Sequence, residues 1–283
     1  MPYKLHIMKT VILTLVLFPL WIIRSVPEKH VYEAATAQQQ LTMQTAKPDS
    51  TPKLPNPEMV LVEGGSYTMG LIRDEAGQGL GRTTRTHPVT LSSFKIAKYE
   101  VTQAEWKSVM GDSLNFSLNQ GCANCPVEEV SWNDVQLFVR NLNTMTGKNY
   151  QLPTEAQWEF AARGGNKSKG YKYAGSDYVD EVVPPASQFT FLGKTLPVGG
   201  SRPNELGIYN MSGNVAEWCQ DWFDSHYKPG AQTDPRGSSS GFGHVIRGGS
   251  WGIHPSGCEV TSFKMGYPND RDAHVGFRLV LIP

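Results

Sequence analysis

The sequence of 283 residues has no excess of either charge, since 26 Lys and Arg residues balance 26 Asp and Glu residues. A formal net charge of zero argues against a protein that binds nucleic acid through bulk positive charge. The sequence also lacks an internal repeat of the roughly 20–50-residue kind that indicates a solenoid or a propeller. Its hydrophobic fraction of 39% and charged fraction of 18% are ordinary for a globular protein. Seven Trp residues predict a core rich in large aromatic side chains.

The N-terminus lacks an apolar run of the roughly 20 residues that a membrane span needs. The run Val11–Ile23 has only 13 apolar or neutral residues and follows Lys4 and Lys9. A basic flank before an apolar run of this length is typical of a signal peptide. Residues 1–33 are therefore predicted to be a signal peptide or an uncleaved signal anchor. The protein is expected in the periplasm or at the cell surface, with residues 11–23 as its sole contact with a membrane.

Cysteine is also absent from the first 121 residues, which excludes a lipid-modified cysteine near the N-terminus. Residues 34–57 are rich in Gln, Thr, Ala, Pro and Lys and show no apolar periodicity, so they predict a flexible linker. Residues 58–283 show no break in composition and predict one folded domain.

Strand-like and helical signals mix along that domain, which predicts an α+β fold. Met59–Val62 is strand-like and runs into a Gly-Gly turn. Three helices are predicted to begin after Thr102, Ser131 and Thr154, because each is followed three residues later by an acidic or amide residue that completes a capping box. Residues 166–197 are predicted to be irregular.

Several motifs together resemble the formylglycine-generating enzyme (sulfatase-modifying factor) family, over about residues 59–283. In chain order they are Gly64-Gly-Ser-Tyr-Thr-Met-Gly70, Tyr99-Glu-Val-Thr102, Leu152-Pro-Thr-Glu-Ala-Gln-Trp-Glu159, Asn204-Glu-Leu-Gly-Ile-Tyr-Asn-Met-Ser-Gly-Asn214, Glu217-Trp-Cys-Gln-Asp-Trp222, Arg247-Gly-Gly-Ser-Trp251 and Gly276-Phe-Arg278. The resemblance implies an irregular, single mixed α/β domain related to C-type lectins, with little regular secondary structure. Because one fold can carry many functions, the site residues must decide the activity.

The copper-binding cysteine pair of the oxidases is missing. In the oxidases, two cysteines with four residues between them follow the Arg-Gly-Gly-Ser motif and bind copper(I). Counting from Ser250, Ile253 stands at the first position and Cys258 at the second. When positions are counted back from the Gly-Phe-Arg motif, the segment between the two motifs is shorter than in the oxidases. On this count Cys258 does not reach the position of the second cysteine either. Copper is not expected on either count, because one thiolate is a poor substitute for two.

The residues that other activities of the family require are also missing from this sequence. The iron-dependent sulfoxide synthases need a His-x3-His-x-Glu cluster, and the seven His residues here are scattered. Ser250 lies in Gly-Gly-Ser-Trp, which is not a Gly-x-Ser-x-Gly nucleophile elbow. The resemblance does imply a calcium loop, with ligands at Asn210, Gly213, Val215 and Glu217. The alternative is a loop held by hydrogen bonds alone.

The four cysteines, Cys122, Cys125, Cys219 and Cys258, are an even set in a chain predicted to be exported, which favours disulfides. Cys122 and Cys125 are expected to form a small structural loop or to be two free thiols. Cys219 and Cys258 lie on the two segments richest in family motif and are candidates to pair with each other. The pairing cannot be derived from the sequence.

Residues 252–275 separate two fixed-looking motifs and have a surface-like composition. Five of them are candidate ligand-binding residues: His254, Phe263, Met265, Tyr267 and Asp272. Met and aromatic side chains make adaptable contacts, and lectin-like relatives of this fold present ligand-binding residues here. The sequence therefore favours an exported binding or scaffold module for a protein or glycan partner, without oxidase activity. The alternative is a divergent oxidase that acts on a sulfatase cysteine through Cys258 and His254.

Overall fold

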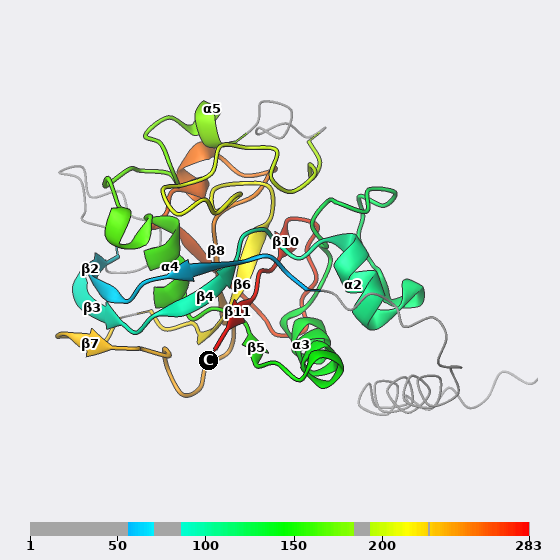
Figure 1. Cartoon of the computed structure of the whole chain (residues 1–283), viewed down its shortest axis with the longest axis horizontal. Coiled ribbons are helices and arrows are strands. Elements are labelled where there is room, and N and C mark those ends of the chain that lie inside the picture. The colour runs from blue at the N-terminus through cyan, green and yellow to red at the C-terminus, as the bar shows by residue number, and fades with distance from the viewer. Residues whose placement is uncertain (1–55, 71–85, 184–192, 226, 283) are drawn as a thin grey trace, which may run out of the picture. The chain divides into compact units, whose positions relative to one another are not determined.

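The computed structural model describes residues 56–70, 86–183, 193–225 and 227–282. They form a single mixed α/β domain within the compact unit Pro52–Pro283 (Figure 1). The predicted signal segment and all but two residues of the predicted linker lie outside the described residues. Among those described, no helix combines the length and the apolar character needed to cross a membrane.

Three small sheets form the framework of this domain. The first has the order β1-β4-β11-β5, with β1 at Met59–Val62, β4 at Phe94–Ala97, β11 at Val280–Leu281 and β5 at Tyr150–Gln151. The second has the order β10-β6-β8-β9, with β10 at Val275–Gly276, β6 at Ala216–Trp222, β8 at His244–Arg247 and β9 at Phe263–Gly266. The third has the order β2-β3-β7, with β2 at Gly65–Met69, β3 at His87–Leu91 and β7 at Gln232–Thr233.

The three predicted capping boxes are confirmed. Thr102 begins α2 (Gln103–Met110), Ser131 begins α3 (Trp132–Thr146) and Thr154 begins α4 (Glu155–Ala162), each with its side chain bonded to the backbone N–H three residues on. In each case the third residue returns a bond to the cap backbone, so two otherwise unpaired N–H groups are satisfied. The predicted strand at Met59–Val62 is also present as β1, paired antiparallel with β4.

The rest of the domain is irregular, as expected. Only the turn η2 (Gly165–Lys167) and the short helix α5 (Val179–Val182) are regular in the described part of residues 166–197. Further 3-10 turns are η1 (Asp112–Leu114) and η4 (Pro255–Cys258). Figure 1 shows α2 and α3 on one side of the domain and the β2-β3-β7 sheet on the other, with β6 and β11 between them.

Large aromatic side chains fill the core, as predicted. Trp106, Trp158 and Trp218 are fully buried. Trp106 stacks on Phe138 with ring centroids 5.2 Å apart. A further stack places the ring of the buried His244 between Trp132 and Trp222, at centroid distances of 3.8 Å and 3.9 Å. This burial lowers the pKa of His244 to about 4.

The last strand closes the first sheet. β11 lies between β4 and β5, with Val280 opposite Ile96 on one side and Gln151 on the other. Just before it, the buried Arg278 donates to the carbonyl oxygen of Ala97 at 3.0 Å and to that of Tyr209 at 2.9 Å. Segments from the start, the middle and the end of the domain therefore meet at Arg278.

Candidate functional site

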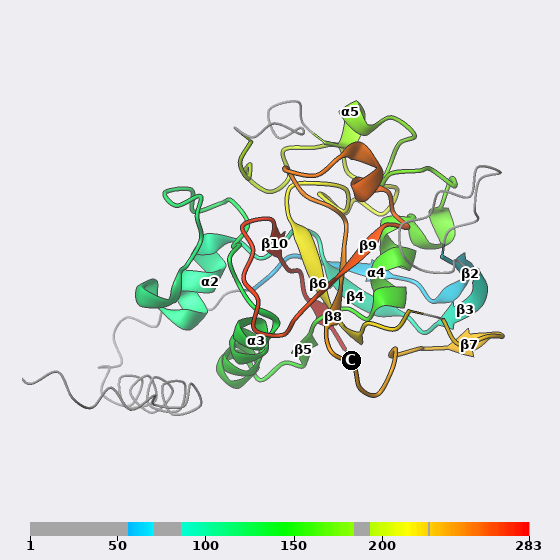
Figure 2. The same cartoon turned by 180° about the vertical axis from the view of Figure 1, so that it is seen from behind.

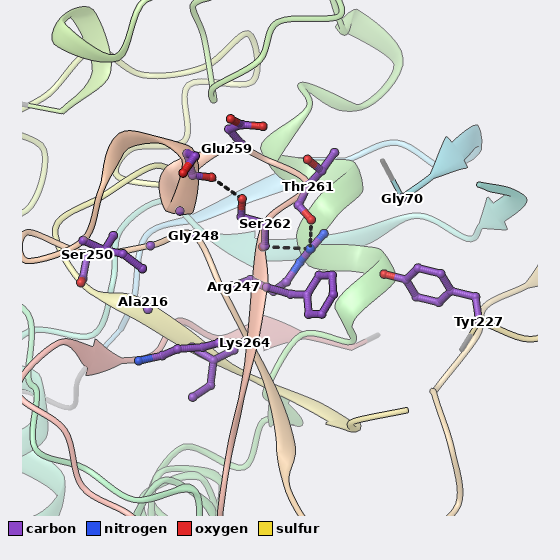
Figure 3. A pocket seen from close by; sticks show the side chains of 16 residues that line it. Gly70, Ala216, Tyr227, Arg247, Gly248, Ser250, Glu259, Thr261, Ser262 and Lys264 are labelled. Carbon is purple, nitrogen blue, oxygen red and sulfur yellow. Dashed lines mark hydrogen bonds between the residues drawn. The ribbon is translucent and has the colours of Figure 1, made fainter. Parts of the chain in front are cut away.

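A hollow of about 620 Å³ opens beside β9, the outermost strand of its sheet. Three stretches build most of its wall: the end of β8 with Gly248–Ser250, the turn around η4, and Thr261–Lys264. Gly70 and Tyr227 lie across from the Gly248–Ser250 stretch, on the other side of β9 (Figure 3). The hollow thus combines the Arg-Gly-Gly-Ser motif with the stretch predicted to contact a partner.

Two glycines shape the wall. Gly248 has φ +91° and Gly249 has φ +66°, a region that side chains other than glycine rarely adopt. A Cβ on Gly249 would lie 2.5 Å from the carbonyl oxygen of Gly257 and 2.7 Å from Cys258 Sγ. Only glycine allows these segments to approach so closely, which explains the pair of glycines in the motif.

Arg247 holds the chain that leads into β9. Its guanidinium is buried and donates to the carbonyl oxygens of Thr261 at 2.9 Å and Ser262 at 3.0 Å (Figure 3), and to that of Val260 at 3.2 Å. It also forms a short ion pair with the buried Glu159. Burial alone would lower the pKa of Arg247, but Glu159 and Glu155 outweigh it and raise the pKa above its usual value. Arg247 therefore stays charged and fixes residues 260–262.

Cys258, the thiol nearest the hollow, is not among the residues of its wall. Cys258 is fully buried and packs with Tyr173, Val182 and Val183. Burial raises the pKa of its thiol to about 12, so it stays protonated at neutral pH. Ile253, in contrast, lines the hollow and is 36% exposed.

These residues do not fit a copper(I) ion. A copper(I) site needs soft ligands, and thiolates are the best of them. The side chain of Ile253 has no donor atom, and the buried Cys258 holds a protonated thiol that donates to the carbonyl oxygen of Ser250. His254, the substitute considered from the sequence, has its Nδ1 at 3.0 Å from Ser256 Oγ and caps η4.

The predicted calcium loop surrounds a buried carboxylate. Glu217 accepts from Arg278 at both carboxylate oxygens, each at 2.7 Å, and from Trp158 Nε1 at 2.7 Å. The carboxylate of Glu100 is also buried and accepts from Asn214 Nδ2 at 2.8 Å and from the Val215 N–H at 3.2 Å. Burial, then the charge of Glu217, raises the pKa of Glu100 to about 8. Two buried carboxylates thus interact in this loop, and the Arg278 guanidinium bonds to that of Glu217.

The same loop has oxygen atoms suited to calcium. Asn210 Oδ1 accepts one bond, from the Gly199 N–H at 2.9 Å, and retains a second lone pair. The backbone carbonyls of the buried Gly213 and Val215 accept no hydrogen bond within the described part of the chain. Unpaired buried carbonyl oxygens beside an excess carboxylate fit a hard cation. No group of three or more His, Cys, Asp or Glu side chains among the described residues is arranged for a metal. Calcium here would therefore rely mainly on carbonyl and amide oxygens, with Glu217 as the one carboxylate of the predicted set.

The five residues predicted for partner contact are spread over the η4 turn, β9 and the segment that follows β9. Phe263 and Met265 lie on one face of β9, because alternate residues of a strand share a face. Phe263 lines the hollow, whereas Met265, 38% exposed, and Tyr267, 53% exposed, lie further along the chain. His254 lies in the turn at η4.

Asp272 belongs to a polar group at the end of the hollow. Its carboxylate contacts His274 Nδ1 at 2.7 Å and Lys264 Nζ at 3.1 Å, and these contacts, that with His274 first, hold the pKa of Asp272 well below its usual range. The His274 ring stacks on Trp251 at a centroid distance of 4.3 Å. Lys264 lines the hollow, so the group reaches its wall.

The cysteine predictions are half right. Cys122 and Cys125 form a disulfide, which is the first of the two alternatives expected for them. The pairing of Cys219 with Cys258 is wrong, since both are free and buried. The physical reason is that they face different clusters. Cys219 packs in the core cluster that contains Trp158, whereas Cys258 packs against Tyr173.

Several wall residues were missed from the sequence. Arg247 was used only as part of a family motif, although a buried Arg beside two glycines is itself a signal for a fixed turn. Gly70 and Tyr227 reach the hollow from distant parts of the chain, and no local pattern marks them. His274 stands two residues after Asp272, a spacing that sequence reasoning did not use.

Comparison with known proteins gives a consistent result. Residues 44–282 match the profile of the sulfatase-modifying factor enzyme 1-like domain. The chain is 32% identical to the chaperone protein LppX of Paenibacillus barcinonensis, over 77% of this chain and 85% of that protein. It is 30% identical to the formylglycine-generating enzyme of Thermomonospora curvata, over 80% and 93% of the two chains. Among solved structures, Treponema denticola variable protein 1 superposes with a TM-score of 0.69 at 27% identity, over 84% of this chain and 100% of that chain.

Proposed function

The chain belongs to the family of sulfatase-modifying factor enzyme 1-like domains, and we propose that it is a member without oxidase activity that binds a protein or glycan partner in the hollow beside β9. The observation that carries this proposal is the chemistry of the wall. Ile253 presents an apolar side chain where an oxidase needs a thiolate, and the Cys258 thiol is buried and donates to the carbonyl oxygen of Ser250. A hollow of about 620 Å³ whose described wall contains no thiol is suited to binding.

The wall also has the mixture of groups that recognition uses. Aromatic and apolar side chains such as Tyr227, Ile253 and Phe263 supply contact area, while Ser256, Thr261 and Ser262 supply hydroxyl groups. Glycines expose backbone between them. The predicted signal segment supports a place outside the cytoplasm, in the periplasm or at the cell surface, where such a domain meets its partner.

We further propose that calcium stabilises the loop that supports the hollow. Asn210 and Glu217 would supply side-chain oxygens, and Gly213 and Val215 would supply carbonyl oxygens. The bound ion adds positive charge beside two buried carboxylates and fixes an irregular loop, with no part in chemistry. Calorimetric titration of the metal-free chain with calcium tests this. Heat of binding together with a higher Tm is expected, whereas neither effect at millimolar calcium would refute it.

Binding is tested by selecting random nonapeptides on phage, and by screening a glycan array, with the full chain. Ser256→Trp places an indole in the hollow, because Ser256 is exposed in its wall. Ser108→Trp is the matched control, because Ser108 is exposed on α2 and does not line the hollow. Wild type and Ser108→Trp should bind the selected peptide or glycan, and Ser256→Trp should lose at least about tenfold in affinity.

Failure to select any binder, or equal binding by both variants, would refute the proposal. If circular dichroism shows that Ser256→Trp does not fold, Ile253→Arg takes its place, since Ile253 also lines the hollow and is partly exposed.

A second candidate function is a divergent formylglycine-generating oxidase. It is favoured by the 30% identity to the enzyme of that name from Thermomonospora curvata and by Cys258, which stands at the second cysteine position when counted from Ser250. The test supplies copper(I), oxygen and a peptide containing Cys-x-Pro-x-Arg, and mass spectrometry monitors conversion of cysteine to formylglycine. Conversion above that of Cys258→Ser would establish the oxidase. No conversion beside an active oxidase as positive control would exclude it.

A further inference from the structure

A second cavity, of about 290 Å³, shares no wall residue with the hollow beside β9. Gln151 of β5, Gln157 of α4 and Gln220 of β6 all line it, so we call it the glutamine pocket. Figure 1 and Figure 2 show β5 and β7 in the lower part of the domain, whereas the η4 turn of the hollow, in orange, lies in the upper part. The glutamine pocket is therefore a separate place for a ligand.

Asp234, which follows β7, fixes one segment of the pocket wall. Its backbone N–H donates to the carbonyl oxygen of Thr90 at 2.9 Å. Its carboxylate accepts from the N–H of Ser92 at 2.8 Å and from Ser92 Oγ at 2.7 Å. Asp234 has φ +44°, a left-handed conformation that Asp adopts more readily than most residues. Three hydrogen bonds thus hold the segment that carries Arg236 before a ligand arrives, which lowers the ordering cost of binding.

The protein itself uses the oxygens of two amide side chains in the wall and leaves their nitrogens free. Gln157 Oε1 accepts from the Thr154 N–H at 3.0 Å, and Gln220 Oε1 accepts from Gln136 Nε2 at 3.5 Å. Thr154 Oγ1 also accepts, from the Gln157 N–H at 3.2 Å. Among the described residues, the Nε2 atoms of Gln157 and Gln220 and the Thr154 hydroxyl have no acceptor. The wall therefore offers amide and hydroxyl donors to a ligand.

Arg236 adds a positive charge to the same wall. Its side chain is exposed and forms no ion pair, hydrogen bond or ring contact within the described part of the chain. The one carboxylate in the described wall, that of Asp234, is engaged by Ser92. Free donors together with a free guanidinium fit a ligand that is rich in acceptor oxygens and carries a negative charge.

The pocket also has an apolar part, which limits the class of ligand further. Its apolar side chains are Leu91, Phe94, Leu152 and Ile282. A sugar ring presents carbon-bound hydrogens on its faces and hydroxyl groups around its rim, so it matches a site that combines apolar contact with a few placed polar groups. At about 290 Å³ the pocket is at the small end of ligand sites, which begin at roughly 300 Å³.

We propose that the glutamine pocket binds an acidic sugar, that is, a sugar that carries a carboxylate. Arg236 pairs with the carboxylate, and the amide nitrogens of Gln157 and Gln220 donate to oxygens of the ring and its hydroxyl groups. Gln151 donates through Nε2 to Asn149 at 3.1 Å, which leaves its Oε1 to accept from a sugar hydroxyl. This site is independent of the binding proposed for the hollow.

The test is titration of the full chain with acidic sugars, followed by saturation-transfer NMR. The ligands are the methyl glycosides of glucuronic acid, galacturonic acid and N-acetylneuraminic acid. The methyl ester of each is its matched neutral ligand, with the same ring and no charge. At least one acid should bind, and its ester should bind at least about tenfold more weakly.

Two variants locate the charge that recognises the acid. Arg236→Gln should weaken binding of the acid by at least about tenfold and change binding of the ester by less than about twofold. Arg140→Gln is the matched control, because Arg140 is exposed on α3 and does not line the pocket. It should bind the acid like wild type.

Four results would overturn the proposal. They are no binding of any of the three acids, equal binding of acid and ester, equal binding by Arg236→Gln and wild type, and displacement of the sugar by acetate or inorganic phosphate at equal concentration. The last would show a general anion site.

Ser256→Trp, which alters the hollow, should bind the acid like wild type, since Ser256 does not line the glutamine pocket. A loss of binding in this variant would place the sugar in the hollow and refute the second site. Failure of the acidic sugars to bind leaves the proposal for the hollow unaffected, because the two sites have no wall residue in common.

Discussion

Replacing Arg247 with methionine tests how the wall of the hollow is held together. The change keeps most of the side-chain bulk but removes the charge that faces the buried Glu159. Breaking a buried ion pair from one side costs about 3–5 kcal/mol, because the remaining charge is left without its partner. Glu159 keeps two donors, the Gly70 N–H and Arg163 Nε, each at 2.9 Å. The expected cost is therefore at the lower end, about 3 kcal/mol.

Urea unfolding followed by tryptophan fluorescence measures this cost. Arg163→Met is the matched control, since Arg163 contacts the same carboxylate but its side chain is 21% exposed. Arg163→Met should lower the free energy of unfolding by less than about 1 kcal/mol. The double variant Arg247→Met with Glu159→Gln should be more stable than the sum of its single changes predicts, by about 1–3 kcal/mol.

Two results would refute the reasoning. One is a decrease of less than about 1 kcal/mol in the free energy of unfolding of Arg247→Met. That result would mean that the ion pair between Arg247 and Glu159 contributes little beyond the cost of burying it. The other is equal loss for Arg247→Met and Arg163→Met, which would mean that the position of the charge is unimportant. Arg247→Met should also weaken binding of the selected peptide, because residues 260–262 lose their anchor.

Three further outcomes are expected. Burial lowers the pKa of His244 from 6.5 to about 4 in the folded protein, so the unfolded chain binds a proton at a higher pH than the folded chain does. The free energy of unfolding should therefore fall by up to about 3 kcal/mol as the pH is lowered from 6.5 to 4. Urea unfolding of His244→Gln should not show this loss. Reducing the Cys122–Cys125 disulfide should lower the free energy of unfolding by only about 2 kcal/mol, because it closes a very short loop; a loss of global folding would contradict this. Gly249→Ala should lower the Tm far more than Gly207→Ala. Both glycines have positive φ, but only at Gly249 would the added Cβ lie 2.5 Å from a backbone atom. Equal shifts in Tm would show that this contact with the Gly257 carbonyl oxygen is unimportant.

Local patterns predicted the helices well. Each capping box lies within four consecutive residues, so its hydrogen bonds depend on the local chain alone. The fold class followed from the motifs and their order, because together they are specific to one family. The sequence left open whether Cys122 and Cys125 form a loop or stay free thiols, and the structure shows the disulfide.

The hollow could not be predicted to the same depth. Its wall joins Gly70, Tyr227 and residues 246–264, which only the tertiary fold brings together. The direction in which Cys258 points was equally hidden, because the sequence gives the position of a thiol but not the cluster it faces. The wrong pairing of Cys219 with Cys258 has this cause. Of the five residues expected to contact a partner, Phe263 lines the hollow, and partner contact itself stays a prediction. Which residues of 252–275 lie in the wall depends on the strand register and the tertiary fold.

The position of β11 has a consequence for how the protein is made. β11 is an inner strand of its sheet, and its last residue, Leu281, pairs with Lys95 and Tyr150. Arg278 joins carbonyls 181 residues and 69 residues away. The N-terminal strands therefore cannot complete their sheet until β11 has emerged from the ribosome. The sheet closes late during synthesis, and the nascent polypeptide stays open until then.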